Sequence, residues 1–129
     1  MENLKHLTPL MKRGSEFLNV KYPILCGAMT WVSEPQLVAA VCNAGCFGCL
    51  AGGNAPVDVL RKQIEELRTL TDKPFAVNLI TIAPAYLSQL ELLTEMKVPY
   101  IVFAGSFPKE KEVIAAKATG AKVMCFAST

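Results

Sequence analysis

Small and amide-bearing residues lie at the ends of four apolar runs of this chain, where a ligand could reach the backbone. The four sets are Gly27-Ala28-Met29, Gly52-Gly53-Asn54, Asn78 and Ala104-Gly105-Ser106. Glycines let a flat ligand approach closely, Asn78 offers both a donor and an acceptor, and Met29 offers a soft apolar contact. Each set taken alone would serve equally well as a tight turn. Together they predict a binding site for a small molecule.

Three of the five cysteines have a spacing that can hold an iron–sulfur cluster. Cys42, Cys46 and Cys49 form a C-x3-C-x2-C pattern, and soft thiolates select such clusters. The apolar pattern places Cys42 on a helix and the other two on a strand, where residues three apart point to opposite faces. We therefore expect small buried side chains and no metal site, with the thiols reduced in the cytoplasm.

The common catalytic and nucleotide-binding motifs are missing from the sequence. It contains neither G-x-G-x-x-G nor the P-loop pattern, and no Ser-His-acid or Cys-His set can be assembled. His6, the only histidine, lies outside the regular pattern and is expected to be solvated. No catalytic residue is assigned from the sequence.

Composition excludes several classes of protein. The chain has 129 residues, a net charge of +2, 52% hydrophobic and 19% charged residues, and it is therefore too apolar to be intrinsically disordered. It has no basic stripe, so no nucleic-acid partner is expected. It also shows no signal-peptide pattern, and the uncharged stretch 35–57 is broken by Gly, Asn and Pro, so we predict no membrane span and a cytoplasmic location.

Five apolar runs alternate with four helical patterns. The expected strands are 22–27, 46–51, 75–80, 100–104 and 122–126, and the later helices are 56–70, 84–97 and 109–119. Continuous apolar runs are typical of strands covered on both faces, as in a parallel sheet. The fold class is therefore α/β, with parallel βα repeats over residues 21–129 and an amino-terminal extension over 1–20. Ligands in such sheets bind beyond the carboxyl ends of the strands, where the four sets above lie.

The first predicted helix has clear boundary signals. Ser33 is expected as the N-cap of a capping box with Gln36, Pro35 in the first turn, and Gly45 as the left-handed residue at the end. In the next helices, apolar spacing predicts one stripe of Val59, Leu60, Ile64 and Leu67 and another of Leu87, Leu90, Leu93 and Met96.

Several segments resemble a known enzyme family. They are Tyr22-Pro-Ile, Gly27-Ala-Met-Thr-Trp-Val32, Leu37-Val-Ala-Ala-Val-Cys-Asn-Ala-Gly45, Gly52-Gly-Asn-Ala-Pro56 and Leu70-Thr-Asp-Lys-Pro-Phe-Ala-Val-Asn78. They are similar to the amino-terminal half of the flavin-dependent nitronate monooxygenases (2-nitropropane dioxygenases) and type II enoyl-acyl-carrier-protein reductases. The segment 52–56 is more similar to the reductase branch.

The resemblance implies a TIM (β/α)8 barrel with FMN at the carboxyl rim of its strands. Gly27, Ala28 and Met29 would line the flavin ring, Gly52 and Gly53 would border the pocket, Asn78 would bind the cofactor, and Ala104 and Gly105 would form the rim after the fourth strand. The implied activity is reduction of an enoyl thioester on acyl carrier protein with NAD(P)H, with oxidation of nitronates by O2 as the alternative. Physically, an amide and backbone donors beside a flavin would orient it.

Two departures and one absence qualify the resemblance. The family has Gln-Gly-Gly-Met where this chain has Cys26-Gly27-Ala28-Met29, and Ala-Gly-Gly-Leu-Gly where it has Ala44-Gly45-Cys46-Phe47-Gly48. The family's catalytic histidine and phosphate-binding loops belong to its carboxyl half, so the chain is expected to be an amino-terminal half barrel. Such a half could associate through its open strand edges as a homo-oligomer, pair with another chain, or be an inactive truncated fragment. If the chain sediments as a well-behaved monomer, a small closed α/β sandwich would be favoured over the half barrel.

Overall fold

The computed structural model describes residues 7–127 as five helices and five strands that alternate along the chain. The helices are α1 (Leu7–Leu18), α2 (Pro35–Asn43), α3 (Val57–Leu70), α4 (Tyr86–Glu95) and α5 (Glu110–Ala118). The strands are β1 (Leu25–Cys26), β2 (Phe47–Ala51), β3 (Ala76–Ile80), β4 (Tyr100–Ala104) and β5 (Lys122–Cys125).

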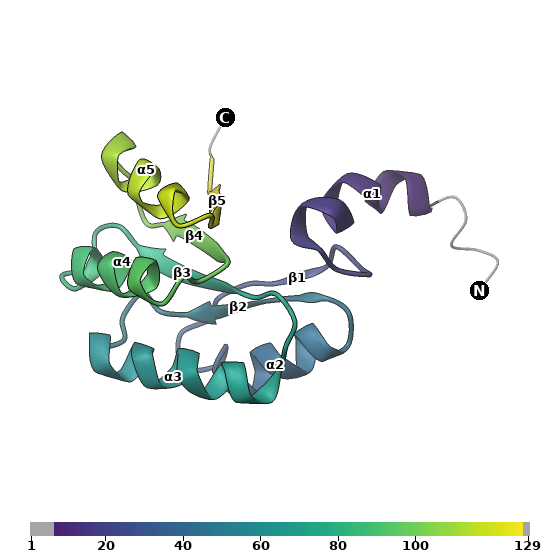
Figure 1. The fold of residues 1–129 in the computed structure, drawn as a ribbon, viewed down its shortest axis with the longest axis horizontal. Helices are drawn as coiled ribbons and strands as arrows, with labels where there is room; N and C mark the ends of the chain where they lie inside the picture. Colours follow the sequence, from purple (N-terminus) through teal and green to yellow (C-terminus); the bar gives the residue numbers. More distant parts are fainter. Residues whose placement is uncertain (1–6, 128–129) are drawn as a thin grey trace.

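All five strands lie in one parallel sheet in the order β1-β2-β3-β4-β5 (Figure 1). The register aligns Ala51 with Asn78 and Asn78 with Val102, so these three residues face the same side. In β2, β3 and β4 the first four residues are all buried. The predicted α/β class with a parallel sheet is confirmed, and burial on both faces explains the unbroken apolar runs.

Helices α2 to α5 cover one face of the sheet. Their buried side chains and the outward residues of the strands form the larger core, which includes Leu60, Ile64, Leu79, Leu93 and Phe103. The stripes predicted for α3 and α4 are correct for most residues. Val59 and Leu87 are exposed, because both lie off the face that contacts the sheet.

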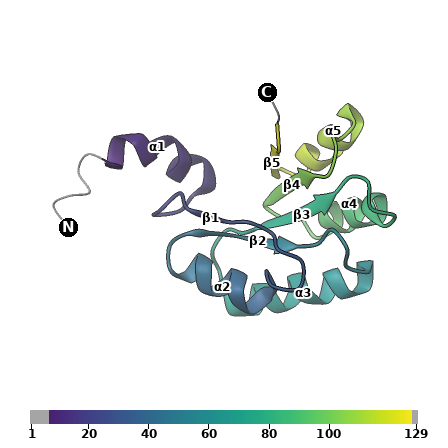
Figure 2. The ribbon, with the colours of Figure 1, turned by 180° about the vertical axis from the view of Figure 1, so that it is seen from behind.

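The opposite face of the sheet carries a smaller core near the amino ends of the strands. Phe47 packs edge-on against Tyr100, with ring centroids 4.9 Å apart. The end of α1 closes this region: Tyr100 and Lys122 both donate hydrogen bonds to the carbonyl of Phe17. Figure 2 shows α1 near the start of β1, away from α2 and α3. The predicted extension 1–20 thus contains a helix that the sequence pattern did not indicate.

The entry to α2 differs from the predicted capping box. Glu34, not Ser33, is the N-cap and makes no side-chain cap. The Gln36 side chain instead donates to Glu66 of α3. Pro35 does begin the helix, and Gly45 has a φ of 85°, as expected for a left-handed helix end. The first strand is only two residues long, shorter than predicted.

The cysteines do not form a cluster. Cys42 lies on α2, Cys49 on β2, and Cys46 just before β2 rather than within it. Within residues 7–127, no group of three metal-ligating side chains is close enough to hold an ion, and Cys26, Cys42, Cys46, Cys49 and Cys125 are free. His6 lies outside the described residues. None of the five described helices has the length and apolar character needed to cross a bilayer.

Candidate functional site

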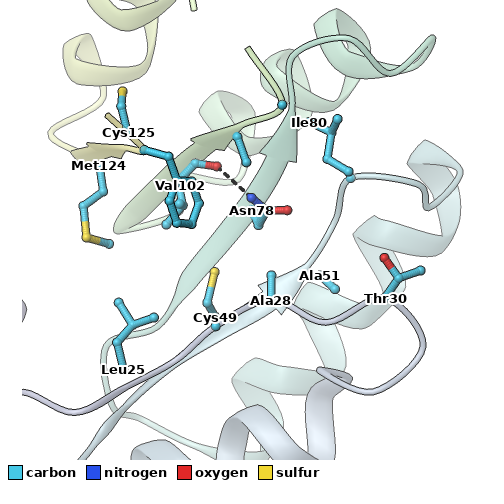
Figure 3. A pocket seen from close by; sticks show the side chains of 15 residues that line it. Leu25, Ala28, Thr30, Cys49, Ala51, Asn78, Ile80, Val102, Met124 and Cys125 are labelled. Atoms are coloured by element: carbon cyan, nitrogen blue, oxygen red, sulfur yellow. Dashed lines mark hydrogen bonds between the residues drawn. The ribbon is translucent and has the colours of Figure 1, made fainter. Parts of the chain in front are cut away.

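A cavity of about 430 Å³ opens beside the inner face of the sheet, toward the carboxyl ends of the strands (Figure 3). Residues from all five strands or the loops that follow them line it. Among the residues predicted for a ligand site, those that line it are Gly27, Ala28, Gly53, Asn78, Ala104 and Gly105. The other lining residues are Leu25, Thr30, Cys49, Ala51, Ile80, Val102, Met124, Cys125 and Phe126.

Two of the residues that the resemblance places at the cofactor, Met29 and Gly52, lie outside the cavity, as do Asn54 and Ser106 of the four loop sets. Met29 is half-exposed and does not line it, although its neighbours Ala28 and Thr30 both do. Gly52 packs within the sheet layer: a Cβ on Gly52 would come within 2.7 Å of the Asn78 carbonyl oxygen. Close packing therefore accounts for glycine at position 52.

Asn78 supplies the main polar group inside an otherwise apolar chamber. Its side-chain amide nitrogen donates to the carbonyl of Val102 at 3.3 Å. Its side-chain oxygen points away from Val102 (Figure 3), and no hydrogen bond occupies it among the described residues. A ligand that donates a hydrogen bond would find an acceptor there.

Two thiols line the cavity in different surroundings. Cys49 is buried, and this burial raises the pKa of its thiol to about 12. Cys125 is exposed at the end of β5. At neutral pH the Cys49 side chain is thus a protonated, uncharged part of the wall.

Ser33 shapes the loop between β1 and α2. Its buried hydroxyl donates to the Gly27 carbonyl at 2.9 Å and accepts from the Met29 N–H at 3.0 Å. Its own carbonyl accepts from the Ala51 N–H at 3.1 Å, which ties the loop to the end of β2. The hydroxyl that resembled a helix cap therefore fixes the backbone beside the cavity.

Gln89 shapes the next loop, between β2 and α3, from outside the sheet. This fully buried side chain of α4 donates to the carbonyls of Gly52 and Ala55, both at 2.7 Å. Gly53 follows in the same loop and faces Ile80, where a Cβ would lie 2.3 Å from the Ile80 Cγ1. The loop therefore sits close against β3, and glycine is needed for that approach.

Thr81 joins the two loops that follow β3 and β4. Its hydroxyl accepts from the Ser106 N–H at 2.8 Å, and it lies 3.1 Å from the carbonyl oxygens of Ala104 and Ser106. Gly105 has a φ of 90° between them. Side-chain hydrogen bonds thus fix the loops on both sides of the cavity.

Sequence reasoning missed most of the apolar wall and the loop-fixing roles of Ser33, Gln89 and Thr81. The inward residues Cys49, Ala51, Val102 and Met124 could be found from the alternation within each strand once its first inward residue is known. Gln89 stands out as a polar residue between apolar positions 86, 90 and 93 of a helix. No sequence signal shows whether the Ser33 hydroxyl caps the helix or fixes the loop before it.

The chain matches the family model for nitronate monooxygenase over residues 11–127. It belongs to the nitronate monooxygenase family. One relative of this family member is "(3aS,4S,5R,7aS)-5-hydroxy-7a-methyl-1-oxo-octahydro-1H-indene-4-carboxyl-CoA dehydrogenase" of Rhodococcus jostii, 36% identical over 110 residues, which are 85% of this chain and 31% of that protein. Another is a nitronate monooxygenase of Paraburkholderia phytofirmans, 48% identical over 68 residues, which are 53% of this chain and 19% of that protein.

Solved structures place the family member among TIM-barrel enzymes. FabK from Thermotoga maritima superposes with a TM-score of 0.86 at 38% identity, covering 91% of this chain and 37% of that one. Nitroalkane oxidase from Streptomyces ansochromogenes gives a TM-score of 0.82 at 27% identity, covering 89% and 42%. The predicted family and barrel fold are confirmed. The chain spans about a third of the length of the first curated relatives it matches.

Proposed function

We propose that this chain forms the flavin-facing part of an FMN-dependent oxidoreductase. The observation that carries the proposal is the convergence of small residues from three βα loops on one apolar cavity with a single free amide oxygen. Membership of an oxidoreductase family supports it. The cavity volume of about 430 Å³ lies in the range of ligand sites, roughly 300–1,000 Å³.

The residues present fit a flat ring system with a polar edge. A Cβ on Gly27 would meet nothing within 4 Å, so its backbone borders open space. Gly27, Ala28 and Gly53 would contact the ring, the Asn78 side-chain oxygen would accept from a ring N–H, and Ala104 and Gly105 would border the rim. Bound FMN supplies hydride transfer. The apolar wall would exclude water from the ring.

The reaction we propose is reduction of an enoyl thioester with electrons from NAD(P)H. The structural likeness to FabK at 38% identity and the relative named as a carboxyl-CoA dehydrogenase support this choice. The substrate would be carried on acyl carrier protein or coenzyme A. The second candidate is oxidation of alkyl nitronates with O2, favoured by the family model and by the 48% identity to a nitronate monooxygenase.

Anaerobic reduction of the flavin separates these two activities. The protein expressed from its complete gene is purified with its flavin and mixed with NADH, NADPH or a propyl nitronate. We expect loss of the flavin absorbance with a nicotinamide nucleotide and reoxidation by crotonyl-CoA. Bleaching by the nitronate alone would support the monooxygenase, and the absence of any bound flavin would overturn the proposal.

Substitution at Asn78 tests the cofactor role of the cavity. Asn78→Leu keeps the side-chain size but removes the amide oxygen, so we expect FMN to bind about tenfold more weakly, the loss of one hydrogen bond of ~1.4 kcal/mol. Fluorescence titration of the apoprotein with FMN measures the change. Asn43→Leu is the control, because Asn43 contacts Leu70 and Thr71 far from the cavity. Equal FMN affinity in Asn78→Leu and the wild type would argue against this site.

A further inference from the structure

Trp31 has an energetically unfavourable side-chain environment and an unfavourable backbone conformation. Its side chain is 83% exposed, although tryptophan is large and mostly apolar. Its backbone has a φ of 66°, a left-handed conformation that is a real outlier for a bulky residue. Neither feature helps the chain to fold, and strained residues of this kind concentrate at ligand sites.

The surrounding turn holds Trp31 in this conformation. The N–H groups of Val32 and Ser33 both donate to the Met29 carbonyl, at 3.0 and 2.8 Å. The Ser33 hydroxyl accepts from the Met29 N–H and donates to the Gly27 carbonyl. These bonds fix the residues on both sides of Trp31, so the exposed position is part of the fold.

Trp31 stands beside a second hollow that adjoins the candidate cofactor cavity. This hollow has a volume of about 280 Å³, and Thr30 and Ala51 line both spaces. Ala55, Pro56 and Val59 form its far, apolar wall. Glu34 is the one charged side chain among its described lining residues. Ser33, Asn54 and Gln63 add neutral polar groups to the lining. The apolar wall can accept an apolar ligand segment, whereas a phosphate or carboxylate would face the Glu34 carboxylate.

We propose that Trp31 is a specificity-determining residue that contacts the apolar acyl chain of the substrate. This inference rests on the proposed function, since it places the acyl chain in the hollow next to the flavin. Contact with an acyl chain would remove the indole from water. An aromatic wall of this kind selects for chain length because each buried methylene adds to binding.

Steady-state kinetics with a short and a long substrate test the contact. We expect Trp31→Ala to raise the KM for dodecenoyl-CoA about tenfold, with little change for crotonyl-CoA and an unchanged kcat. Trp31→Phe should restore most of the long-chain preference. If nitronates prove to be the substrates, nitronates of short and long nitroalkanes replace the thioesters. Equal effects on both chain lengths, or none, would overturn the inference.

A glycine substitution separates this role from a structural one. Trp31→Gly relieves the left-handed strain, so its Tm should not fall, while its long-chain KM rises as in Trp31→Ala. Lys97→Gly is the matched control, because Lys97 has a φ of 50° at the end of α4 and is exposed. It should keep both its Tm and its KM. A lower Tm in Trp31→Gly with an unchanged KM would show that Trp31 only supports the fold.

Fluorescence gives a readout that does not depend on turnover. Trp31 is the single tryptophan of the chain, so the difference between wild type and Trp31→Phe isolates its emission. Dodecenoyl-CoA should change this difference signal with saturation near its KM, and coenzyme A alone should not. No change on substrate addition to a flavin-containing protein would overturn the inference while leaving the flavin proposal intact.

Discussion

The thiol of Cys49 makes the stability of the fold depend on alkaline pH. The cysteine pKa rises from 9.0 to about 12 because the side chain is buried, so the folded state disfavours the thiolate. Below about pH 9 the thiol is protonated in both the folded and the unfolded chain, so it does not change the free energy of unfolding. Between about pH 9 and pH 12 only the unfolded chain ionises at this site, and stability falls by up to ~1.4 kcal/mol per pH unit.

We therefore expect the free energy of unfolding to decrease between about pH 8 and pH 10, with a smaller decrease in Cys49→Ala. Urea unfolding of the wild type and the variant at both pH values measures this decrease. Burial also raises the pKa values of Cys42 and Tyr86, so part of the slope should remain in the variant. Identical slopes in the two proteins would contradict the assignment.

A side chain at position 52 and one at position 27 would meet different surroundings. A Cβ on Gly52 would meet the Asn78 carbonyl at 2.7 Å and Val77 at 3.1 Å, whereas one on Gly27 would meet nothing. Gly52→Ala should destabilise the fold by about 1–3 kcal/mol. Gly27→Ala should leave stability within about 1 kcal/mol of the wild type. Chemical denaturation of both variants checks the contrast, and equal losses would refute it.

At the scale of elements, α4 supports the loop after β2 through one buried side chain. Gln89→Met has a similar volume but removes the donor to the Gly52 and Ala55 carbonyls, of which Gly52 keeps the Ala55 N–H at 3.0 Å. We expect a loss of about 1–3 kcal/mol, because the Ala55 carbonyl is left without a partner. Urea unfolding measures the loss.

The control for this substitution is Gln63→Met on α3. The side-chain oxygens of Gln63 and Gln89 both lack a hydrogen-bond partner among the described residues, but only the Gln89 amide nitrogen donates hydrogen bonds. Replacement of Gln63 should therefore change stability by less than about 1 kcal/mol. Similar losses in the two variants would show that the Gln89 bonds contribute little.

The accuracy of the sequence predictions also varies from element to element. β4 was predicted to the residue, because its apolar run is bounded by Pro99 and Gly105 and both of its faces are buried. α1 was missed because its contacts, through Phe17 to Tyr100 and Lys122, are distant in sequence. The site was predicted loop by loop, but a loop sequence does not show which residue turns inward. The sequence therefore does not show that Met29 and Gly52 lie outside the cavity.

At the scale of the whole molecule, the apolar composition matches a sheet that is buried on both faces. Within residues 7–127, β5 pairs only with β4 and β1 only with β2, so each has one open edge there. Leu25 and Phe126, near these edges, are exposed. Unpaired parallel edges with apolar neighbours favour association with further strands.

We expect the isolated 129-residue chain to form homo-oligomers, with sedimentation equilibrium as the measurement. Met124→Lys places a charge on the inner face of β5 and should shift the population toward monomer. Lys111→Glu, a charge change on the outer helix α5, should not. A wild-type chain that sediments as a monomer at all concentrations would contradict this expectation.

The order of the strands also bears on how the protein is made. Each strand from β2 to β5 pairs with the strand synthesised before it. A ribosome releases the chain from its amino end, so every new βα unit emerges beside a finished template. The apolar residues of one unit are then covered before those of the next appear. If a strand had to pair with a segment synthesised much later, its apolar residues would stay exposed to water during synthesis and could aggregate.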